Sequence, residues 1–449
     1  VDGRYAEKAA ELRDIFSEYG LIKRRTLVEV RWLQVLAGEF WVQEVSALSS
    51  RAKRALESVV TEFEIEDASR IKAIERDTHH DVKAVEYFLK EKVSSNTELA
   101  RLSEYFHFAN TSEDINNLAH GLMLIEARAL LLRVLDELLR AMALCAKRGA
   151  GMAMLARTHG QPASPTTLGK EVAVFIHRLQ GQIESFRAIR ILGKANGAVG
   201  NFNAHFAACP EVDWMNVSKR FVTALGLEWN PHTTQIEPHD YMAEYFHGLI
   251  RLNSILIDFC RDVWGYLSLG YFTQRTVRGE VGSSTMPHKV NPIEFENAEG
   301  NLGVANSLLQ YMAEKLPVSR WQRDLTDSTT LRNVGTAIAH CLIAWRACLH
   351  GLGRLEPDAT ALRRDLDQNW EVLSEAIQTV MRRHGIDEPY EQIRKLTHGK
   401  KVGAKDLHAF IRKLDLPAAV KKRLLKLTPE SYTGNAEEQA RSIVRSVLE

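Results

Sequence analysis

Five long segments of this chain contain no proline and only one or two glycines each, and they constrain the fold more than any other feature. In residues 115–147, apolar side chains recur at a spacing of three and four, the spacing of an amphipathic helix. The other four segments span about 166–192, 240–269, 294–315 and 328–352. Helices of about 22–33 residues are far longer than the usual mean of ~11–12, and they need mutual packing in an extended bundle. Since strand patterns are scarce, the sequence predicts an all-α protein.

The remaining residues indicate how the chain is organised. Residues 1–110 have shorter helical patterns with a charged middle, and the patterns shorten again after the last long segment. We therefore predict three helical domains: an N-terminal domain of residues 1–110, a central long-helix bundle of residues 111–352, and a C-terminal domain of residues 353–449.

Composition excludes several classes of function. The 449 residues carry 58 Lys and Arg against 57 Asp and Glu, so no net field favours nucleic acid or an anionic membrane. No apolar stretch approaches the ~18–20 residues of a membrane span. The five cysteines are odd in number and lack metal-ligand spacing, which favours free thiols in the cytoplasm and no metal site. We expect that any anionic ligand is held by local clusters.

The loop at residues 282–292 has the sequence GSSTMPHKVNP. A glycine-serine entry lets backbone N–H groups turn toward a ligand, and Lys289 and Asn291 offer a cation and donors to a carboxylate. Ser283 and Ser284 lie at its start. A flexible surface loop is the alternative interpretation, because most Gly/Ser loops are connectors.

Two histidine motifs could transfer protons. His159 lies between Thr and Gly just before the second long segment, where its ring could face a cleft. A hydrogen-bonded structural histidine is the alternative. His79 and His80 precede Asp81, but adjacent histidines on a helix point about 100° apart, so their spacing does not suit a metal. A pairing that tunes a proton donor and a solvated helix end both remain open.

Two further segments suit anions. Thr111 and Ser112 read as a helix cap, and a helix N-terminus with two hydroxyls also binds anions. The segment 319–332 brings arginines and hydroxyls to another helix start, the mixture that phosphate and carboxylate recognition requires, although Arg–Asp salt bridges would explain it equally. Arg4, Tyr5 and Gln235 are uninformative alone.

The residues of these motifs resemble those of a known protein family. GSSTMPHKVNP resembles the signature GSSxMPxKxNP of the fumarase/aspartase superfamily. Across nearly the whole chain the sequence resembles the adenylosuccinate lyases in their longer bacterial form, on the strings VDGRY, TSEDINNL, RTHGQPASP, TTQIEPHDY and SRWQRDLTDST. The resemblance implies three α-helical domains, a homotetramer with a core of twenty helices, active sites shared among three subunits, and no metal or organic cofactor.

It also implies roles for individual residues. His159 resembles the general acid, Ser283 the general base, and His80 a second histidine that assists at the succinyl group. Lys289 and Asn291 match positions that hold the succinyl carboxylate. The remaining substrate-binding matches are Arg4, Tyr5, Arg323, Ser328 and Arg332 on the phosphate side, and His79, Asp81, Thr111, Ser112, Gln235, Ser284, Asn297 and Thr329 among the other substrate contacts. His79 is a departure, since an asparagine or another small polar residue is expected there.

The implied reaction is an anti elimination of fumarate from adenylosuccinate, and likewise from succinyl-aminoimidazole-carboxamide ribotide, in purine nucleotide biosynthesis. Ser283 is a poor base in water, so we expect residues 280–292 to form a mobile lid that desolvates it beside Lys289. Two alternatives stay open: another fumarate-releasing lyase such as argininosuccinate lyase, and a non-catalytic relative.

Overall fold

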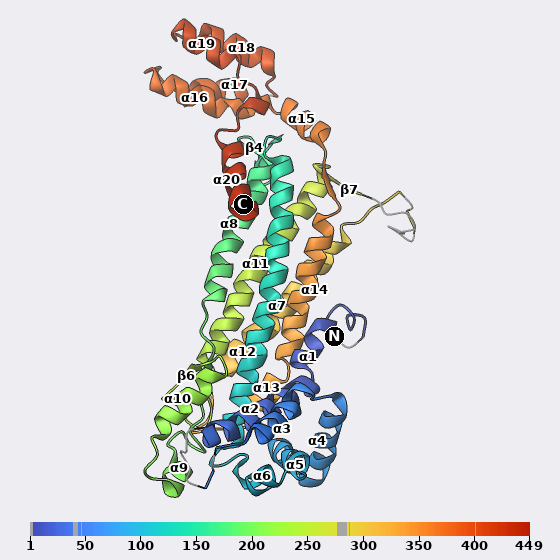
Figure 1. Ribbon diagram of the computed structural model, residues 1–449. Coiled ribbons are helices and arrows are strands. Elements are labelled where there is room, and N and C mark those ends of the chain that lie inside the picture. Colours follow the sequence, from blue (N-terminus) through green and yellow to red (C-terminus); the bar gives the residue numbers. More distant parts are fainter. Residues whose placement is uncertain (1–2, 39–43, 46, 276–284, 287, 400) are drawn as a thin grey trace. The chain divides into compact units, whose positions relative to one another are not determined.

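The computed structural model describes residues 3–38, 44–45, 47–275, 285–286, 288–399 and 401–449, and it confirms the all-α prediction (Figure 1). The strands among these residues are only two or three residues long. None of the described helices is long and apolar enough to cross a membrane.

Apart from α2 (Glu18–Gly38), which has 21 residues, the helices before α7 (Ser112–Gly149) are short, and polar side chains cap several of them. Ser49, His80 and Asn96 each accept a hydrogen bond from a backbone N–H in the first turn that follows, which satisfies donors that a helix start leaves unpaired. These elements are η1 (Ala10–Leu12), α1 (Arg13–Phe16), α2 (Glu18–Gly38), α3 (Ser50–Thr61), α4 (Ile65–Thr78), α5 (Asp81–Val93), α6 (Thr97–Arg101) and η2 (Ser103–Tyr105).

Four of the five predicted long helices are present with nearly the predicted bounds: α7 (Ser112–Gly149), α8 (Leu168–Arg187), α11 (Asp240–Ser268) and α12 (Ile293–Lys315). At the start of α7, the backbone N–H of Thr111 donates to the Asp114 carboxylate at 2.8 Å, so the predicted cap is confirmed. Helix α8 is shorter than predicted because residues on both sides of it pair as strands.

The prediction of a fifth long helix is wrong, because residues 328–352 belong to two helices. Helix α13 (Thr326–Leu331) ends before α14 (Val334–Leu352) begins. At the break the Asn333 side chain donates to the Thr329 carbonyl at 3.0 Å, and its backbone N–H bonds to Thr330. A side chain that takes a helical carbonyl in this way competes with continuation of the helix.

The remaining elements connect or follow the long helices. The strands pair as β1 (Ala153–Met154) with β4 (Thr166–Thr167), β2 (Arg157–Thr158) with β3 (Gln161–Pro162), β7 (Phe272–Gln274) with β8 (Leu355–Pro357), all antiparallel, and β5 (Leu192–Gly193) with β6 (Glu228–Trp229), parallel. The other helices are α9 (Asn203–Ala208), α10 (Trp214–Ala224), α15 (Ala359–Asp367), η3 (Trp370–Leu373), α16 (Ser374–Arg383), α17 (Pro389–Thr397), α18 (Ala404–Lys413), α19 (Ala418–Leu425), η4 (Pro429–Ser431) and α20 (Ala436–Leu448).

The chain divides into two compact units. Unit 1 comprises Val1–Arg133, Ile183–Asn253 and Asn301–Ile343, and unit 2 comprises Val134–Gln182, Ser254–Gly300 and Ala344–Glu449. Compactness is a different criterion from the sequence pattern, so the predicted domains 1–110, 111–352 and 353–449 stay a prediction.

Within unit 1, the long helices and α2 pack through large buried side chains. The fully buried Trp32 of α2 lies 5.0 Å from Phe221 between ring centroids, and its indole N–H donates to the Phe108 carbonyl. Tyr245 of α11 stacks edge-on against Phe186 of α8 at 4.7 Å. Aromatic pairs of this kind add to the free energy of apolar burial. Unit 1 therefore has a tightly packed apolar core.

Within unit 2, a second aromatic series joins the long helices. Phe259 of α11 lies edge-on to Phe175 of α8 at 5.4 Å and to Phe295 of α12 at 6.3 Å. Arg157 donates to the Tyr271 hydroxyl at 2.6 Å and pairs with Asp365 at 2.7 Å, which links β2 to α15 and to the residue just before β7.

Candidate active site

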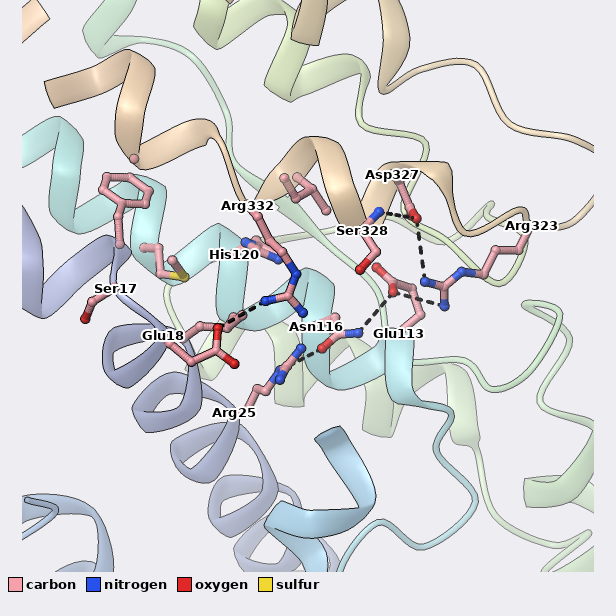
Figure 2. Close-up of a pocket in the computed structure, with 15 residues that line it drawn as sticks. Ser17, Glu18, Arg25, Glu113, Asn116, His120, Arg323, Asp327, Ser328 and Arg332 are labelled. Carbon is pink, nitrogen blue, oxygen red and sulfur yellow. Dashed lines mark hydrogen bonds and ion pairs between the residues drawn. The ribbon is translucent and has the colours of Figure 1, made fainter. Parts of the chain in front are cut away.

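A polar cavity of about 230 Å³ lies in unit 1, among α2, the first turns of α7, helix α13 and the start of α14 (Figure 2). It carries cationic, anionic and hydroxyl side chains, so it suits a charged ligand rather than an apolar one. Its lining residues are Phe16, Ser17, Glu18, Leu21, Arg25, Glu113, Asn116, His120, Met123, Arg323, Asp327, Ser328, Leu331, Arg332 and Gly335.

Three arginines reach this cavity, and each has an acidic partner. Arg323 approaches Glu113 at 3.2 Å and Asp327 at 3.6 Å, and Arg332 lies 3.0 Å from Glu18. Arg25 is buried and lies 2.7 Å from Asp81. Cations and carboxylates are therefore nearly balanced in this chain, and an anionic ligand would have to share or displace these partners.

The polar contacts form one continuous series across the cavity. The Nε of Arg25 donates to Asn116 Oδ1 at 2.9 Å, and the amide of Asn116 donates to Glu113 at 3.3 Å. Glu113 in turn pairs with Arg323, whose Nη1 also donates to Gln235 Oε1 at 3.2 Å. Figure 2 shows Arg25, Asn116, Glu113 and Arg323 in this order along the cavity wall. The series links Asp81 to the segment that carries Ser328.

Burial controls the protonation of the histidine in the cavity wall. Burial, followed by the positive charge of Arg25, lowers the pKa of His120 to about 3, so its ring is neutral near pH 7. A neutral imidazole can accept a hydrogen bond from a ligand as well as donate one.

Several predicted residues meet here. Arg323, Ser328 and Arg332 line the cavity, Gln235 contacts Arg323, and Asp81 contacts Arg25. Other predicted residues of unit 1 do not line it: Thr329 is exposed on α13, Arg4 is exposed, and Tyr5 lies beside Asn301 and His340. Thr111 and Ser112 are half-buried at the start of α7.

The two adjacent histidines lie at the junction of α4 and α5 and not within one helix, which agrees with the helix-end interpretation. His79 ends α4 in the left-handed conformation with φ 53°, and His80 is the cap of α5. The Nδ1 of His80 accepts a hydrogen bond from the Lys83 backbone N–H at 3.1 Å, which leaves the proton on Nε2 of the exposed ring. Burial would raise the pKa of Asp81, but Arg25 and the Val82 N–H outweigh it and lower that pKa.

His159 lies in unit 2, at the tip of a two-residue hairpin between β2 and β3. His159 and Gly160 have φ of 53° and 75°, the left-handed pair that a tight hairpin turn of this kind requires. The turn leaves the imidazole exposed. The other predicted residues described in unit 2 are the exposed Lys289 and the half-buried Asn291 and Asn297. Ser283, Ser284 and the first part of the predicted lid, residues 280–284, lie outside the described residues, as does residue 287.

Sequence reasoning missed several cavity residues. Glu113 and Asp327 line the cavity and lie inside motifs that stand out for their other residues. His239 belongs to the string EPHDY and lies near both side chains, although it does not line the cavity itself. Arg25 carries no local signal, because one arginine on an amphipathic helix is usually solvent-exposed.

Comparisons with known proteins identify the same family over nearly the whole chain. A family model described as "Lyase" matches residues 3–306, and one described as "Adenylosuccinate lyase C-terminal" matches residues 319–433. An adenylosuccinate lyase of Haemophilus influenzae is 55% identical over 443 residues, which are 98% of this chain and 96% of that protein. One of Escherichia coli strain K12 is 57% identical over 437 residues, 97% of this chain and 96% of that protein.

Solved structures of low sequence identity share the fold. A fumarate lyase from Mesorhizobium sp. BNC1 has a TM-score of 0.77 at 18% identity and covers 97% of both chains. The 3-carboxy-cis,cis-muconate lactonizing enzyme from Pseudomonas putida has a TM-score of 0.76 at 21% identity and covers 98% of this chain and 97% of its own.

Proposed function

The chain belongs to the adenylosuccinate lyase family, and from this membership we propose that it cleaves adenylosuccinate to AMP and fumarate. The same elimination converts succinyl-aminoimidazole-carboxamide ribotide to the free carboxamide ribotide in purine nucleotide biosynthesis. The observation that carries the proposal is the identity of 55–57% to adenylosuccinate lyases over nearly the full chain. The cavity with Arg323, Ser328 and Arg332 supports it, because a nucleotide substrate needs a phosphate site.

The proposed chemistry is an elimination across a C–N bond. Ser283 takes the proton from the carbon beside a succinyl carboxylate, the electron pair forms the C=C bond of fumarate, and the C–N bond breaks. His159 gives the departing nitrogen its proton from the opposite face, and His80 assists at the succinyl group. Positioned acid–base catalysis supplies about 10²–10⁴-fold, so electrostatic stabilisation must supply much of the rest.

Charge stabilisation is the proposed task of the remaining residues. As the proton leaves, negative charge grows on the succinyl carboxylate, where Lys289 and Asn291 would offer a cation and donors. The proposed phosphate-side residues are Arg4, Tyr5, Arg323, Ser328 and Arg332, and the other proposed contacts are His79, Asp81, Thr111, Ser112, Gln235, Ser284, Asn297 and Thr329. Binding energy from the phosphate, remote from the reacting carbon, would hold the succinyl group in a reactive geometry.

We further propose a homotetramer with active sites shared between subunits, working in the cytoplasm. Large apolar side chains on the long helices support this, since Leu144, Trp264, Val304 and Tyr311 are 47–56% exposed in the single chain. Such surfaces on a soluble protein are commonly covered by a partner. The five buried free cysteines suit a reducing compartment. Light scattering should give four times the 50.7 kDa chain mass.

The deciding experiment follows ultraviolet absorbance when adenylosuccinate is added to wild type, Ser283→Ala and His159→Ala protein. Loss of the succinyl group changes the purine spectrum, so turnover is read directly. Activity in wild type that collapses in both variants is the expected result. No turnover by wild-type protein of the native oligomeric mass would overturn the proposal, and argininosuccinate would then be the next substrate to test.

A further inference from the structure

Three buried side chains meet behind Arg323 without an evident structural purpose. Glu113 of α7, His239 just before α11 and Asp327 of α13 are 2%, 0% and 5% exposed, and their ligand-type atoms all lie within 4.8 Å of one another. Figure 2 shows Glu113 and Asp327 on either side of the Arg323 guanidinium. We call these three residues the acid cluster.

Among the described residues, the acid cluster has three buried acceptors without a donor, and two nearby buried donors, Arg323 Nε and the Tyr241 hydroxyl, also lack a hydrogen-bond partner. The His239 Nδ1 lies 3.3 Å from the Leu316 carbonyl, an acceptor, so Nδ1 carries the hydrogen and Nε2 has a free lone pair. Across the part of the chain that the structure describes, His239 Nε2, Glu113 Oε1 and Asp327 Oδ2 have no hydrogen-bond partner. Three acceptors that face one another in a buried site are costly, and a single proton on either carboxyl group would give the imidazole its donor.

The surrounding charges favour a proton over a metal ion. Arg323 lies 3.2 Å from Glu113, so a divalent cation held by the acid cluster would face a guanidinium at close range. Lys194 adds positive charge from the loop after β5, and Asp240 and Tyr241 interact with His239 and Glu113 respectively from α11. Burial raises the pKa of Glu113 to about 7, against the pull of Arg323, and burial lowers the pKa of His239.

We propose that Glu113, Asp327 and His239 hold one buried proton, and that the substrate phosphate binds to Arg323 together with this proton. The proposal rests on the proposed function, and it makes Glu113 and His239 positioning residues for the phosphate. Each cavity arginine already has a carboxylate partner, so a phosphate dianion adds negative charge that nothing else in the cavity offsets. Protonation of Glu113 releases the Arg323 guanidinium for the phosphate and removes the repulsion between the two anions.

Binding should therefore take up a proton from solvent. At pH 7.5 the phosphate of AMP is almost entirely the dianion, because its second pKa is about 6, so the ligand itself contributes little. Wild-type protein should take up on the order of half a proton per AMP bound. Above the pKa of Glu113, the affinity for AMP should decrease with pH, and the decrease should approach a factor of about ten for each pH unit.

The experiment is calorimetric titration of the native oligomer with AMP at pH 7.5 in buffers of different ionisation enthalpy, which yields the number of protons exchanged. Glu113→Gln keeps the shape of the side chain and should abolish the uptake and flatten the pH dependence of AMP affinity. Glu18→Gln is the matched control, because Glu18 lines the same cavity and pairs with Arg332 outside the acid cluster. It should keep the uptake, and adenosine should produce none.

Each outcome is decisive. AMP binding without proton uptake in wild type, or uptake that survives in Glu113→Gln, would overturn the shared proton while turnover of adenylosuccinate still supported the function. If Glu113→Gln does not fold, Asp327→Asn and the pH dependence of the wild type still test it. Thermal stabilisation of wild type by Mn²⁺ that Glu113→Gln removes would replace the proton with a metal. A chain that neither binds AMP nor turns over adenylosuccinate would fail on both counts.

Discussion

Glu113 and Asp114 are neighbours in the first turn of α7, both are buried, and their surroundings differ sharply. Asp114 accepts hydrogen bonds from the backbone N–H groups of Thr111, Asn196 and Gly197, and Lys194 lies 2.8 Å from it with its side chain fully buried. Glu113 shares one arginine with Asp327, and one of its oxygens has no partner in the described structure.

The two positions represent two uses of a buried carboxylate. The acidic side chain that faces the core has a full set of partners and fixes the loop after β5 against the helix. The one that faces the cavity is left partly unsatisfied, as groups that must change protonation or partner often are. The same division continues one turn later, because Asn117 lies on the core side and Asn116 on the cavity side. We call these the core face and the cavity face of α7.

The largest effect should follow from Asp114→Asn. This change leaves Lys194, 0% exposed, without its counterion, and the loss of one partner of a buried pair typically costs about 3–5 kcal/mol. The urea midpoint followed by circular dichroism should fall accordingly, whereas Glu113→Gln should hardly change it at low pH. A loss below about 1 kcal/mol for Asp114→Asn would remove the distinction between the two faces.

Ionisation of Glu113 should make the free energy of unfolding depend on pH. Burial raises its pKa from 4.5 to about 7 in the folded chain, so the folded state holds this proton more tightly than the unfolded chain does. Its favourable contribution is complete below pH 4.5 and is lost as pH rises through 7, on the order of 1–3 kcal/mol. Urea midpoints between pH 5 and 8 should fall in wild type more steeply than in Glu113→Gln. Equal slopes would show that the Glu113 carboxylate is ionised throughout.

Local sequence rules predicted the helices and the charged segments that form the cavity, but not which residues pair across it. The cap of α7 and the lengths of α7, α11 and α12 follow from short-range features, namely hydroxyl and acidic residues at the start and the absence of proline. Arg323, Ser328 and Arg332 were identifiable because arginines and hydroxyls cluster within one segment. Local chemistry of this kind needs no knowledge of the fold.

Long-range pairings could not be predicted in this way. Glu113 meets Arg323 across more than two hundred residues, and Arg25 meets Asp81 only because α2 packs beside α5. The break between α13 and α14 depends on one side-chain hydrogen bond, which the apolar periodicity does not register. Tertiary packing decides all three, so the sequence alone contained the components of the cavity but not their arrangement.

His205 of α9 should produce the opposite slope with pH. It is fully buried against Trp214 at 4.9 Å between ring centroids, and burial lowers its pKa from 6.5 to about 4. Its contribution to stability is therefore complete above pH 6.5 and is lost as pH falls toward 4, again on the order of 1–3 kcal/mol. The thermal midpoint of wild type should drop between pH 6.5 and 4, and His205→Gln should drop less. A parallel drop in both proteins would locate the acid sensitivity elsewhere.

The adjacent asparagines provide the smallest and most selective test. Asn117 is 1% exposed, and its amide donates to the Lys194 carbonyl while its oxygen accepts from the Lys194 N–H, so Asn117→Ala should cost about 1–3 kcal/mol of stability. Asn116→Ala removes only a half-buried link between Arg25 and Glu113, and it should cost less than about 1 kcal/mol. The effects of the two variants on the KM for adenylosuccinate should have the opposite order.

Asn116→Ala should raise the KM for adenylosuccinate several-fold because Arg25 and Glu113 lose their shared partner, and Asn117→Ala protein that remains folded should keep the wild-type KM. If both variants lowered stability and raised KM to the same extent, the first turns of α7 would form a single cooperative unit, and the separation into a core face and a cavity face would not hold.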